Sequence, residues 1–314
     1  MEKSRFTMDA VIPTFYPGPG VRRLFSRLLR QTYPLKKIII MNTERDGWRD
    51  EYLPEIPAGS STVFEIHHIG REEFDHGKTR DQGARYSDAD LLLFMTHDAV
   101  PATDRLTERL AEAFDDARVA AAYARQLPAE GCNPIERITR DFNYPAESRV
   151  KDAGDLETLG IKTYFCSNVC AVYRRSVYDE LGGFIRHTIF NEDMIFAAAA
   201  VKAGYAVAYV SGAQVIHSHN YSAMEYLRRN FDLGVSQADH PEVFSGVPSE
   251  GEGVRMVKET ARRLAAGGKV HLIPKLLADS AFKYAGYRLG KAYRRLPQPV
   301  IMRLTMNRAY WKES

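Results

Sequence analysis

Three polar clusters carry residue types that could do chemistry, and each lies at the end of an expected strand or the start of an expected helix. They are residues 96–98 (Thr-His-Asp), 191–193 (Asn-Glu-Asp) and 217–219 (His-Ser-His). At the first cluster, the His97 imidazole and the Asp98 carboxylate together could hold a hard or borderline cation. A turn-capping aspartate there, and an acidic first helical turn at the second cluster, are the structural alternatives, and both stay open at this point.

These clusters need a sheet to position them, and the pattern of apolar runs predicts one. Residues 91–95 form a short apolar run that ends abruptly at the first cluster, which is typical of a strand buried on both faces. Open α/β sheets place their ligands at the carboxyl ends of their strands, where this cluster would lie. The run therefore predicts a ligand site at that sheet edge.

The first half of the chain alternates between expected strands and helices, which predicts an α/β sheet domain built from βαβ units. We expect strands at 8–13, 38–41, 63–69, 91–95 and 119–123, and helices at 21–29, 78–86 and 104–114. Residues 131–160 show no clear period, and we expect loops and short helices there. Further on we expect a strand or strand pair at 163–173, helices at 175–181 and 191–203, and strands at 205–210 and 213–216.

The C-terminal part differs in composition. A capping box at residues 222–225 predicts a helix start, and Gly246, Pro248, Gly251 and Gly253 make a linker-like stretch before a basic helical end. We therefore predict two domains, 1–235 and 236–314. Residues 255–314 carry a net charge of +11, which leaves −8 for the rest of the chain. Such a basic end favours contact with anions, namely membrane lipid, a phosphorylated acceptor or nucleic acid, although a solvated helical face would look the same.

Composition excludes several classes of protein. The 26% charged and 45% hydrophobic residues are ordinary for a globular protein, and three cysteines are too few for a disulfide framework. The N-terminus lacks the apolar core of a signal peptide, and no apolar run is long enough to span a bilayer, so we expect a cytosolic protein. The sequence contains no dinucleotide fingerprint, Walker loop, His-Glu-x-x-His motif or nucleophile elbow.

The clusters and their order resemble family 2 of the inverting, nucleotide-sugar-dependent glycosyltransferases, which have the GT-A fold. The resemblance extends from residue 8 to about 235. Segments 74–80, 167–171 and 217–222 look most like rhamnosyltransferases, which use dTDP-rhamnose to build bacterial surface polysaccharide. The motifs that carry the family resemblance are Val11-Ile12-Pro13-Thr14, Thr96-His97-Asp98-Ala99, Leu181-Gly182-Gly183-Phe184, Asn191-Glu192-Asp193 and His217-Ser218-His219.

The resemblance implies a role for each cluster. Asp193 matches the general base of the family, with Glu192 beside it, and would deprotonate the acceptor hydroxyl as that hydroxyl attacks the anomeric carbon. Asp98 matches the last aspartate of the Asp-x-Asp motif, which binds a divalent metal on the donor diphosphate. His217 and His219 would complete that site. The first aspartate of the motif is replaced here, and the metal is expected to be Mn²⁺ or Mg²⁺.

The resemblance also implies contacts to both substrates. For the donor, the turn after the first strand and the end of the second strand would hold the nucleoside, and the segment before the fourth strand would reach the sugar and diphosphate. The expected donor-binding residues are Pro13, Thr14, Asn42, Glu44, His76, Lys78, Arg80, Asp81, His97 and Asp98. For the acceptor, the expected residues are Ser167, Asn168 and Asn191.

Together these residues predict an α/β, GT-A type enzyme that moves a sugar, with L-rhamnose from dTDP-rhamnose favoured, to a hydroxyl of a saccharide or lipid-linked acceptor. The alternatives are a UDP- or GDP-hexose donor on the same fold, and a non-catalytic sugar-nucleotide-binding protein. A nucleotidyltransferase is disfavoured because its glycine- and lysine-rich loop is absent. The acidic body argues against a nucleic-acid partner. We expect a cytoplasmic protein with peripheral contact to the anionic inner face of the plasma membrane through its basic end.

Overall fold

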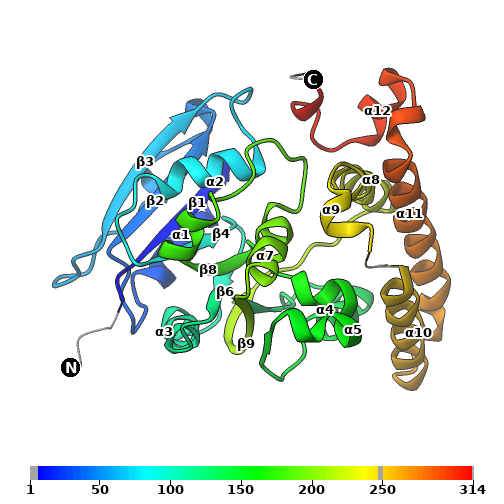
Figure 1. Ribbon diagram of the computed structural model, residues 1–314, viewed down its shortest axis with the longest axis horizontal. Coiled ribbons are helices and arrows are strands. Elements are labelled where there is room, and N and C mark those ends of the chain that lie inside the picture. The colour runs from blue at the N-terminus through cyan, green and yellow to red at the C-terminus, as the bar shows by residue number, and fades with distance from the viewer. Residues whose placement is uncertain (1–5, 247–249, 313–314) are drawn as a thin grey trace.

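The computed structural model describes residues 6–246 and 250–312, and Figure 1 shows a twisted sheet beside a group of C-terminal helices. The sheet is mixed, with neighbouring strands in the order β3-β2-β1-β4-β8-β6-β9-β5, and β7 pairs with β9. The strands are β1 (Met8–Phe15), β2 (Lys37–Thr43), β3 (Val63–Ile69), β4 (Leu91–Met95), β5 (Val100–Pro101), β6 (Val119–Leu127), β7 (Arg149–Lys151), β8 (Cys170–Arg174) and β9 (Ala206–Ile216).

Most strands run in one direction. β1 is parallel to β2 and β4, and β2 is parallel to β3. β8 is antiparallel to both β4 and β6, and β6 is parallel to β9, so β6 and β9 point the same way as β1. The carboxyl ends of these parallel strands therefore meet at one edge of the sheet, where α/β sheets bind ligands.

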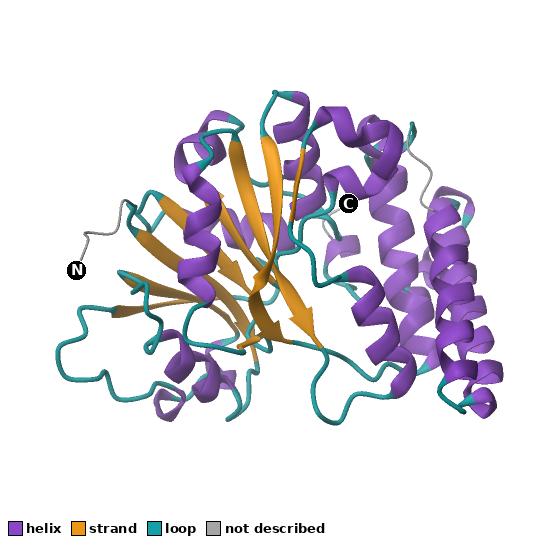
Figure 2. Cartoon of the chain, turned by 90° about the horizontal axis from the view of Figure 1, so that it is seen from below, coloured by secondary structure: helices purple, strands orange, loops and turns teal. Residues whose placement is uncertain are grey.

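Helices cover both faces of the sheet (Figure 2) because successive residues of a strand face opposite sides. Ile12 packs into the cluster formed with α1 and α3, whereas Val11 packs into the cluster formed with α2, α6 and α7. The helices are α1 (Val21–Leu28), α2 (His76–Ala84), α3 (Leu106–Glu112), α4 (Pro134–Asn143), α5 (Leu156–Leu159), α6 (Arg175–Glu180), α7 (Glu192–Lys202), α8 (Ala223–Asp239), α9 (Pro241–Phe244), α10 (Glu250–Ala266), α11 (Ile273–Lys291) and α12 (Gln298–Leu304).

The α/β class and the helical C-terminal region agree with the sequence predictions, and two local predictions were wrong. Strands expected at 205–210 and 213–216 form the single strand β9, because a register shift against β6 absorbs residues 211–213 as a bulge. Of the strand expected at 163–173, only β8 is extended, and Gly160–Tyr164 forms a 3₁₀ turn.

The C-terminal helices are packed tightly against the rest of the chain through α8. A Cβ atom at Gly286 or Gly290 of α11 would lie 2.1 Å from the Leu227 or Phe231 carbonyl oxygen of α8, so only glycine permits this approach. The predicted boundary between residues 235 and 236 falls inside α8, and the division into two domains stays a prediction. Gly251 and Gly253 of the expected linker lie within α10, and Pro248 lies outside the described residues.

Among the described residues, no helix combines the length and the apolar character that crossing a membrane requires.

Candidate active site

A cavity of about 300 Å³ opens at the sheet edge where the carboxyl ends of the parallel strands meet. β6 contributes Gln126, the residues that follow β9 contribute two histidines, and the loop before β8 contributes Ser167 and Asn168. The start of α7 closes another side. All three polar clusters found in the sequence therefore contribute to one cavity, the first of them through Thr96. The charged or imidazole-bearing wall of this cavity includes His76, Arg80, Glu192, Asp193, His217 and His219.

Asp193 lies in the first turn of α7, and its carboxylate is held by the backbone. Its Oδ2 accepts a hydrogen bond from the Asn168 amide at 2.9 Å, and its Oδ1 accepts one from the Met194 amide at 2.8 Å. Burial and the nearby negative charge of Glu192 raise the pKa of Asp193 to about 7. A carboxylate with such a pKa can take a proton from a hydroxyl near neutral pH, as a general base does.

Glu192 is buried next to Asp193 and is paired with a cation. The Arg80 guanidinium Nη1 lies 3.2 Å from Glu192 Oε1, and both side chains are less than 8% exposed. The Asn168 side-chain amide also donates a hydrogen bond to Glu192 Oε1. Burial alone would raise the pKa of Glu192, but the charges of Arg80 and His76 and the hydrogen bond from Asn168 together outweigh burial and lower that pKa. Glu192 therefore stays ionised and keeps Asp193 basic.

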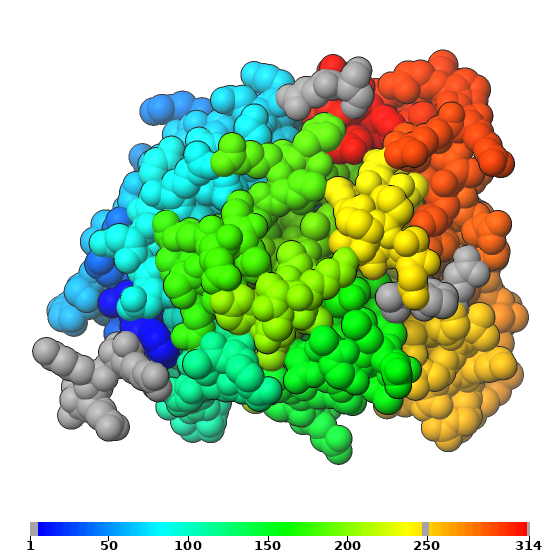
Figure 3. Space-filling view, viewed as in Figure 1, coloured from blue at the N-terminus to red at the C-terminus, as the bar shows by residue number. Residues whose placement is uncertain are grey.

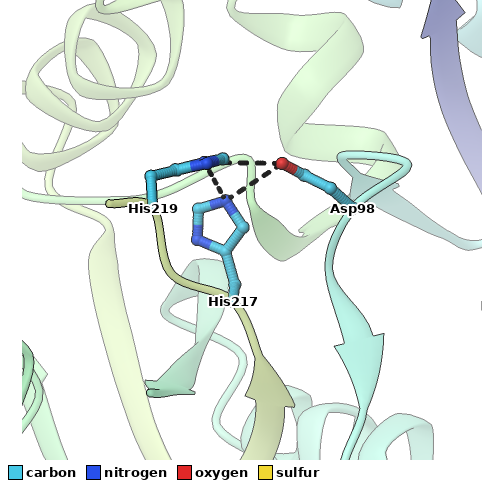
Figure 4. A group of neighbouring side chains, drawn as sticks. All are labelled: Asp98, His217 and His219. Atoms are coloured by element: carbon cyan, nitrogen blue, oxygen red, sulfur yellow. Dashed lines mark hydrogen bonds and ion pairs between the residues drawn. The ribbon is translucent and has the colours of Figure 1, made fainter. Parts of the chain in front are cut away.

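Asp98, His217 and His219 converge on one point, as Figure 4 shows. The Nε2 atoms of His217 and His219 lie 3.5 and 3.4 Å from Asp98 Oδ2, and 3.0 Å from each other. The expected metal-ligating residues are thus brought together from two strand ends. Burial opposes ionisation of Asp98, but its hydrogen bond with His217 and the positive charge of that ring hold its pKa below the usual value.

Asp98, His217 and His219 fit a divalent cation, and a further hydrogen bond to Gln126 orients one of the two histidines. Gln126 Oε1 lies 3.0 Å from His217 Nδ1 and can accept the Nδ1 proton, so His217 can offer its Nε2 lone pair to a cation once Nε2 has released its proton. Burial and the neighbouring His217 lower the pKa of His219 to about 4, which keeps that ring neutral. Two imidazoles with one carboxylate suit Mn²⁺ better than Mg²⁺, which prefers oxygen ligands only.

The donor-binding residues expected at the ends of the first two strands lie close together, but Thr14 and Asn42 use their side chains to bind each other. The Thr14 hydroxyl donates to Asn42 Oδ1 at 2.9 Å, and Asn42 in turn donates to the Glu44 carbonyl. Pro13 is buried within β1. Their sequence neighbours Phe15 and Thr43 line a second, larger cavity that continues from the first. The strand ends therefore form the floor of a cleft.

Besides the strand-end residues and Asp98, three expected donor residues line neither cavity. Lys78 is exposed on α2, and His97 is half-buried beside Asp98 without lining either cavity. Asp81 faces the other way: its carboxylate pairs with Arg85 at 3.0 Å and Arg186 at 3.5 Å and borders a separate small cavity. A helix turns 100° per residue, so the neighbours Arg80 and Asp81 on α2 cannot share one face.

All three expected acceptor residues, Ser167, Asn168 and Asn191, line the first cavity, and the two asparagines also hold other parts of the protein. Asn168 uses its polar atoms internally: it donates to Asp193 and Glu192 and accepts from the Tyr173 hydroxyl at 2.8 Å. Asn191 has φ of +67° and donates its side-chain amide to the Ser236 hydroxyl at 3.0 Å. Both asparagines therefore fix the start of α7 that carries the carboxylates.

The residues of the cavity wall that the sequence reasoning missed include Gln126, Arg140, Tyr221 and Arg229. Asn133 and Pro134 gave a readable signal for α4, which carries Arg140, because an asparagine N-cap followed by proline at N1 starts helices. Tyr221 borders the histidine cluster in the sequence. Gln126 and Arg229 have no such local signal.

Comparison with known proteins adds independent findings. Residues 9–182 match the family model described as "Glycosyl transferase family 2". The chain is 39% identical over 305 residues to the O-antigen chain rhamnosyltransferase RfbN of Salmonella typhimurium, which covers 96% of this chain and 95% of that protein. It is 37% identical over 307 residues to the O-antigen chain rhamnosyltransferase WbaN of Salmonella anatum, which covers 96% and 94%.

Among solved structures, the chain is similar to a mannosyltransferase of Pyrobaculum calidifontis determined with GDP-Man and Mn²⁺. The TM-score is 0.52 at 16% sequence identity, and the match covers 98% of this chain and 86% of that one. At this identity the likeness shows a common fold.

Proposed function

Because the chain belongs to Glycosyl transferase family 2, we propose that it transfers L-rhamnose from dTDP-rhamnose to a hydroxyl of a saccharide or lipid-linked acceptor during synthesis of a surface polysaccharide. The family match spans more than half of the chain, and both rhamnosyltransferase relatives match nearly all of it. The expected family, the enzyme class and the GT-A type fold are thereby confirmed. The donor sugar, the acceptor and the residue roles are the proposal.

One observation carries the residue assignment: Asp193, His217 and His219 line the same cavity. A base for the acceptor and a cation site for the leaving group would then lie on two sides of one substrate. Single-displacement transfer with inversion needs this arrangement, because the acceptor oxygen attacks the anomeric carbon from the face opposite the diphosphate.

Asp193 is the proposed general base. As the acceptor oxygen forms its bond to the anomeric carbon, Asp193 accepts the hydroxyl proton, and the bond from that carbon to the diphosphate breaks. The two amide hydrogen bonds from Asn168 and Met194 hold the carboxylate in place. Glu192 keeps its charge through Arg80 and so keeps Asp193 basic enough for this step.

Asp98, His217 and His219 are the proposed metal ligands. A divalent cation bound there supplies positive charge that stabilises the departing nucleoside diphosphate. The Mn²⁺ in the mannosyltransferase of similar fold is consistent with a divalent cation in this cleft. Arg229 and His76 lie where the first cavity meets the second one, and Arg229 would bind the diphosphate on the side away from Asp193.

The remaining expected residues keep proposed roles that follow their positions. Pro13, Thr14, Asn42 and Glu44 would shape the floor under the nucleoside, and Ser167 would contact the acceptor. Asn168 and Asn191 would position the carboxylates of α7.

We also propose that α11 contacts the anionic inner face of the plasma membrane, in a cytoplasmic protein. Leu277, Phe282 and Tyr284 of this helix are 55%, 37% and 53% exposed, and Arg288 is exposed beside them. Apolar side chains flanked by cations suit an anionic lipid surface, where each cation contributes about 1 kcal/mol. Flotation with vesicles containing phosphatidylglycerol should recover the protein, and Leu277→Glu should reduce that recovery. Absence of binding at physiological salt would overturn this location.

The transfer reaction is tested by following nucleoside diphosphate release from dTDP-rhamnose, UDP-glucose and GDP-mannose, with and without Mn²⁺ or Mg²⁺. With a lipid-linked saccharide acceptor from an O-antigen-producing cell, dTDP-rhamnose should turn over and should need a divalent cation. Faster turnover of UDP-glucose or GDP-mannose would contradict the donor assignment. Full activity in EDTA would contradict the metal role.

A further inference from the structure

The second cavity has a wall that comes from the far end of the chain. It measures about 680 Å³, and one side is formed by Phe15, Thr43 and Arg71 at the ends of β1, β2 and β3. The facing side consists of residues 305–309, which follow α12. In Figures 1 and 3 this C-terminal segment (red) lies between the sheet and the orange C-terminal helices.

The segment is fixed in place by one buried carboxylate. Asp232 of α8 is only 3% exposed. It accepts hydrogen bonds from the Thr305 hydroxyl at 2.7 Å, the Met306 amide at 2.9 Å and the Asn307 amide at 3.3 Å. Trp311, a few residues later, packs with Phe231 and other apolar residues of the same region. The wall is therefore an ordered part of the fold.

The cavity is rich in cations that the protein itself does not neutralise. Arg71, Arg228, Arg229 and Arg308 line it, and among the described residues none of them forms an ion pair with a carboxylate. Arg228 donates to the Arg303 carbonyl, and Arg229 lies 4.7 Å from the centre of the Phe190 ring.

The two acids of this wall are already engaged. Glu225 accepts from Ser222 in the capping box at the start of α8, and Asp232 holds the C-terminal segment. The guanidinium groups of the four arginines thus remain available to bind a ligand. Phosphate oxygens suit them, because each planar guanidinium can donate two parallel hydrogen bonds to one phosphate.

The cavity is continuous with the catalytic one, since His76, Phe190 and Arg229 line both. A ligand whose reacting carbon lies near Asp193 would therefore extend past Arg229 toward Phe15 and Thr43. The Thr43 hydroxyl is buried and has no hydrogen-bond partner among the described residues, which leaves it for a ligand. The size and charge of this space fit a nucleoside diphosphate.

We propose that residues 305–309 form a wall of the donor-nucleotide site and that Arg308 binds the nucleoside diphosphate part of the donor. This inference rests on the proposed function, because it assigns part of the donor site of that reaction. Thr305 is a positioning residue, since it acts through Asp232 on the segment that carries Arg308. Residues more than 200 positions apart in the chain would then enclose one nucleotide.

Calorimetric titration with dTDP in the presence of Mn²⁺ tests the role of Arg308. Arg308→Ala should weaken dTDP binding about tenfold or more, as expected for loss of a charge-assisted hydrogen bond. It should raise KM for the nucleotide sugar more than it lowers kcat. Arg303→Ala is the matched control, because Arg303 is an exposed arginine of α12 that does not line the cavity.

Equal dTDP affinity in Arg308→Ala and wild type would overturn the inference while leaving the proposed function intact. An equal loss in Arg303→Ala and Arg308→Ala would also overturn it, since the effect would then be general charge. A wild-type protein that binds none of dTDP, UDP and GDP would instead contradict the proposed function itself.

A second pair of variants tests the clamp on the segment. Thr305→Val removes the hydroxyl that donates to Asp232 with little change of shape, whereas Thr305→Ser keeps it. The valine variant should bind dTDP several-fold more weakly and the serine variant should restore binding. Wild-type affinity in Thr305→Val would show that the segment needs no such positioning.

Discussion

The two halves of the cleft satisfy their polar groups in opposite ways. In the catalytic half, Glu192 and Arg80 are buried and Asp193 is half-buried, and protein partners hold all three at 2.8–3.2 Å. In the nucleotide half, Arg71 and Arg308 are exposed and lack carboxylate partners among the described residues. Reaction chemistry requires groups already in position, since reorganising them would cost rate. Binding of a charged donor instead benefits from cations that the ligand neutralises.

The largest effect on stability is expected for a substitution in the catalytic half, and a similar substitution in the nucleotide half should cost much less. Arg80→Met should leave Glu192 buried without its partner and should lower the free energy of unfolding by about 3–5 kcal/mol. Arg229 is exposed and packs on the Phe190 ring, so Arg229→Met should lower the free energy of unfolding by about 1 kcal/mol or less. Urea denaturation of both variants measures the difference. Equal losses would show that the catalytic half is no more preorganised than the nucleotide half.

The cation site should depend on a residue that touches no metal. Gln126→Leu removes the acceptor for the His217 Nδ1 proton and should weaken Mn²⁺ binding about 10- to 100-fold. Titration followed by the electron paramagnetic resonance signal of Mn²⁺ measures this affinity. Thr103→Ala, on the loop before α3 and outside the lining of both cavities, is the control. Unchanged Mn²⁺ affinity in Gln126→Leu would refute the orienting role.

The pH dependence should report the electrostatics of the catalytic half. Asp193 works as a base only when ionised, so kcat/KM should fall as the pH drops below its pKa of about 7. Glu192→Gln removes a negative charge that raises this pKa, so the acidic limb of the profile should move to lower pH. Asp179→Asn, an exposed carboxylate of α6, should leave the limb in place. A limb that stays unmoved in Glu192→Gln would contradict the coupling.

The smallest effect is expected at Lys78, which the sequence marked as a donor residue. Lys78 is exposed and lines neither cavity, so Lys78→Ala should change KM for the nucleotide sugar by less than about twofold. Steady-state kinetics measures it. A tenfold rise in KM would mean that α2 rearranges toward the donor when it binds.

The sequence predicted the features that depend on residues close together in the chain. The strand ends, the capping box at Ser222 and the acidic start of α7 are local patterns, and the structure has them. The grouping of Asp98 with His217 and His219 was implied by the family resemblance, and the structure brings the three together because β4 and β9 end at one edge of the sheet.

Contacts between segments that are far apart in the chain leave no local pattern in the sequence, so they could not be predicted. Asp232 binds Thr305 across 73 residues, and no spacing rule connects them. Asp81 and Lys78 were predicted to bind the donor because of their place in a sequence motif. The direction in which their side chains point depends instead on how α2 is rotated against the sheet. Gly83 fixes that rotation, because a Cβ there would lie 2.4 Å from Val11 of β1.

The central claim is that one half of the cleft performs the reaction and the other half binds the nucleotide. Asp193→Asn tests it most directly when rhamnosyl transfer and dTDP affinity are measured on the same preparation. Transfer should fall by about 10²–10⁴-fold, while the dissociation constant for dTDP stays within about twofold of wild type. Full transfer by the variant, or a loss of dTDP affinity as large as the loss of transfer, would contradict this division.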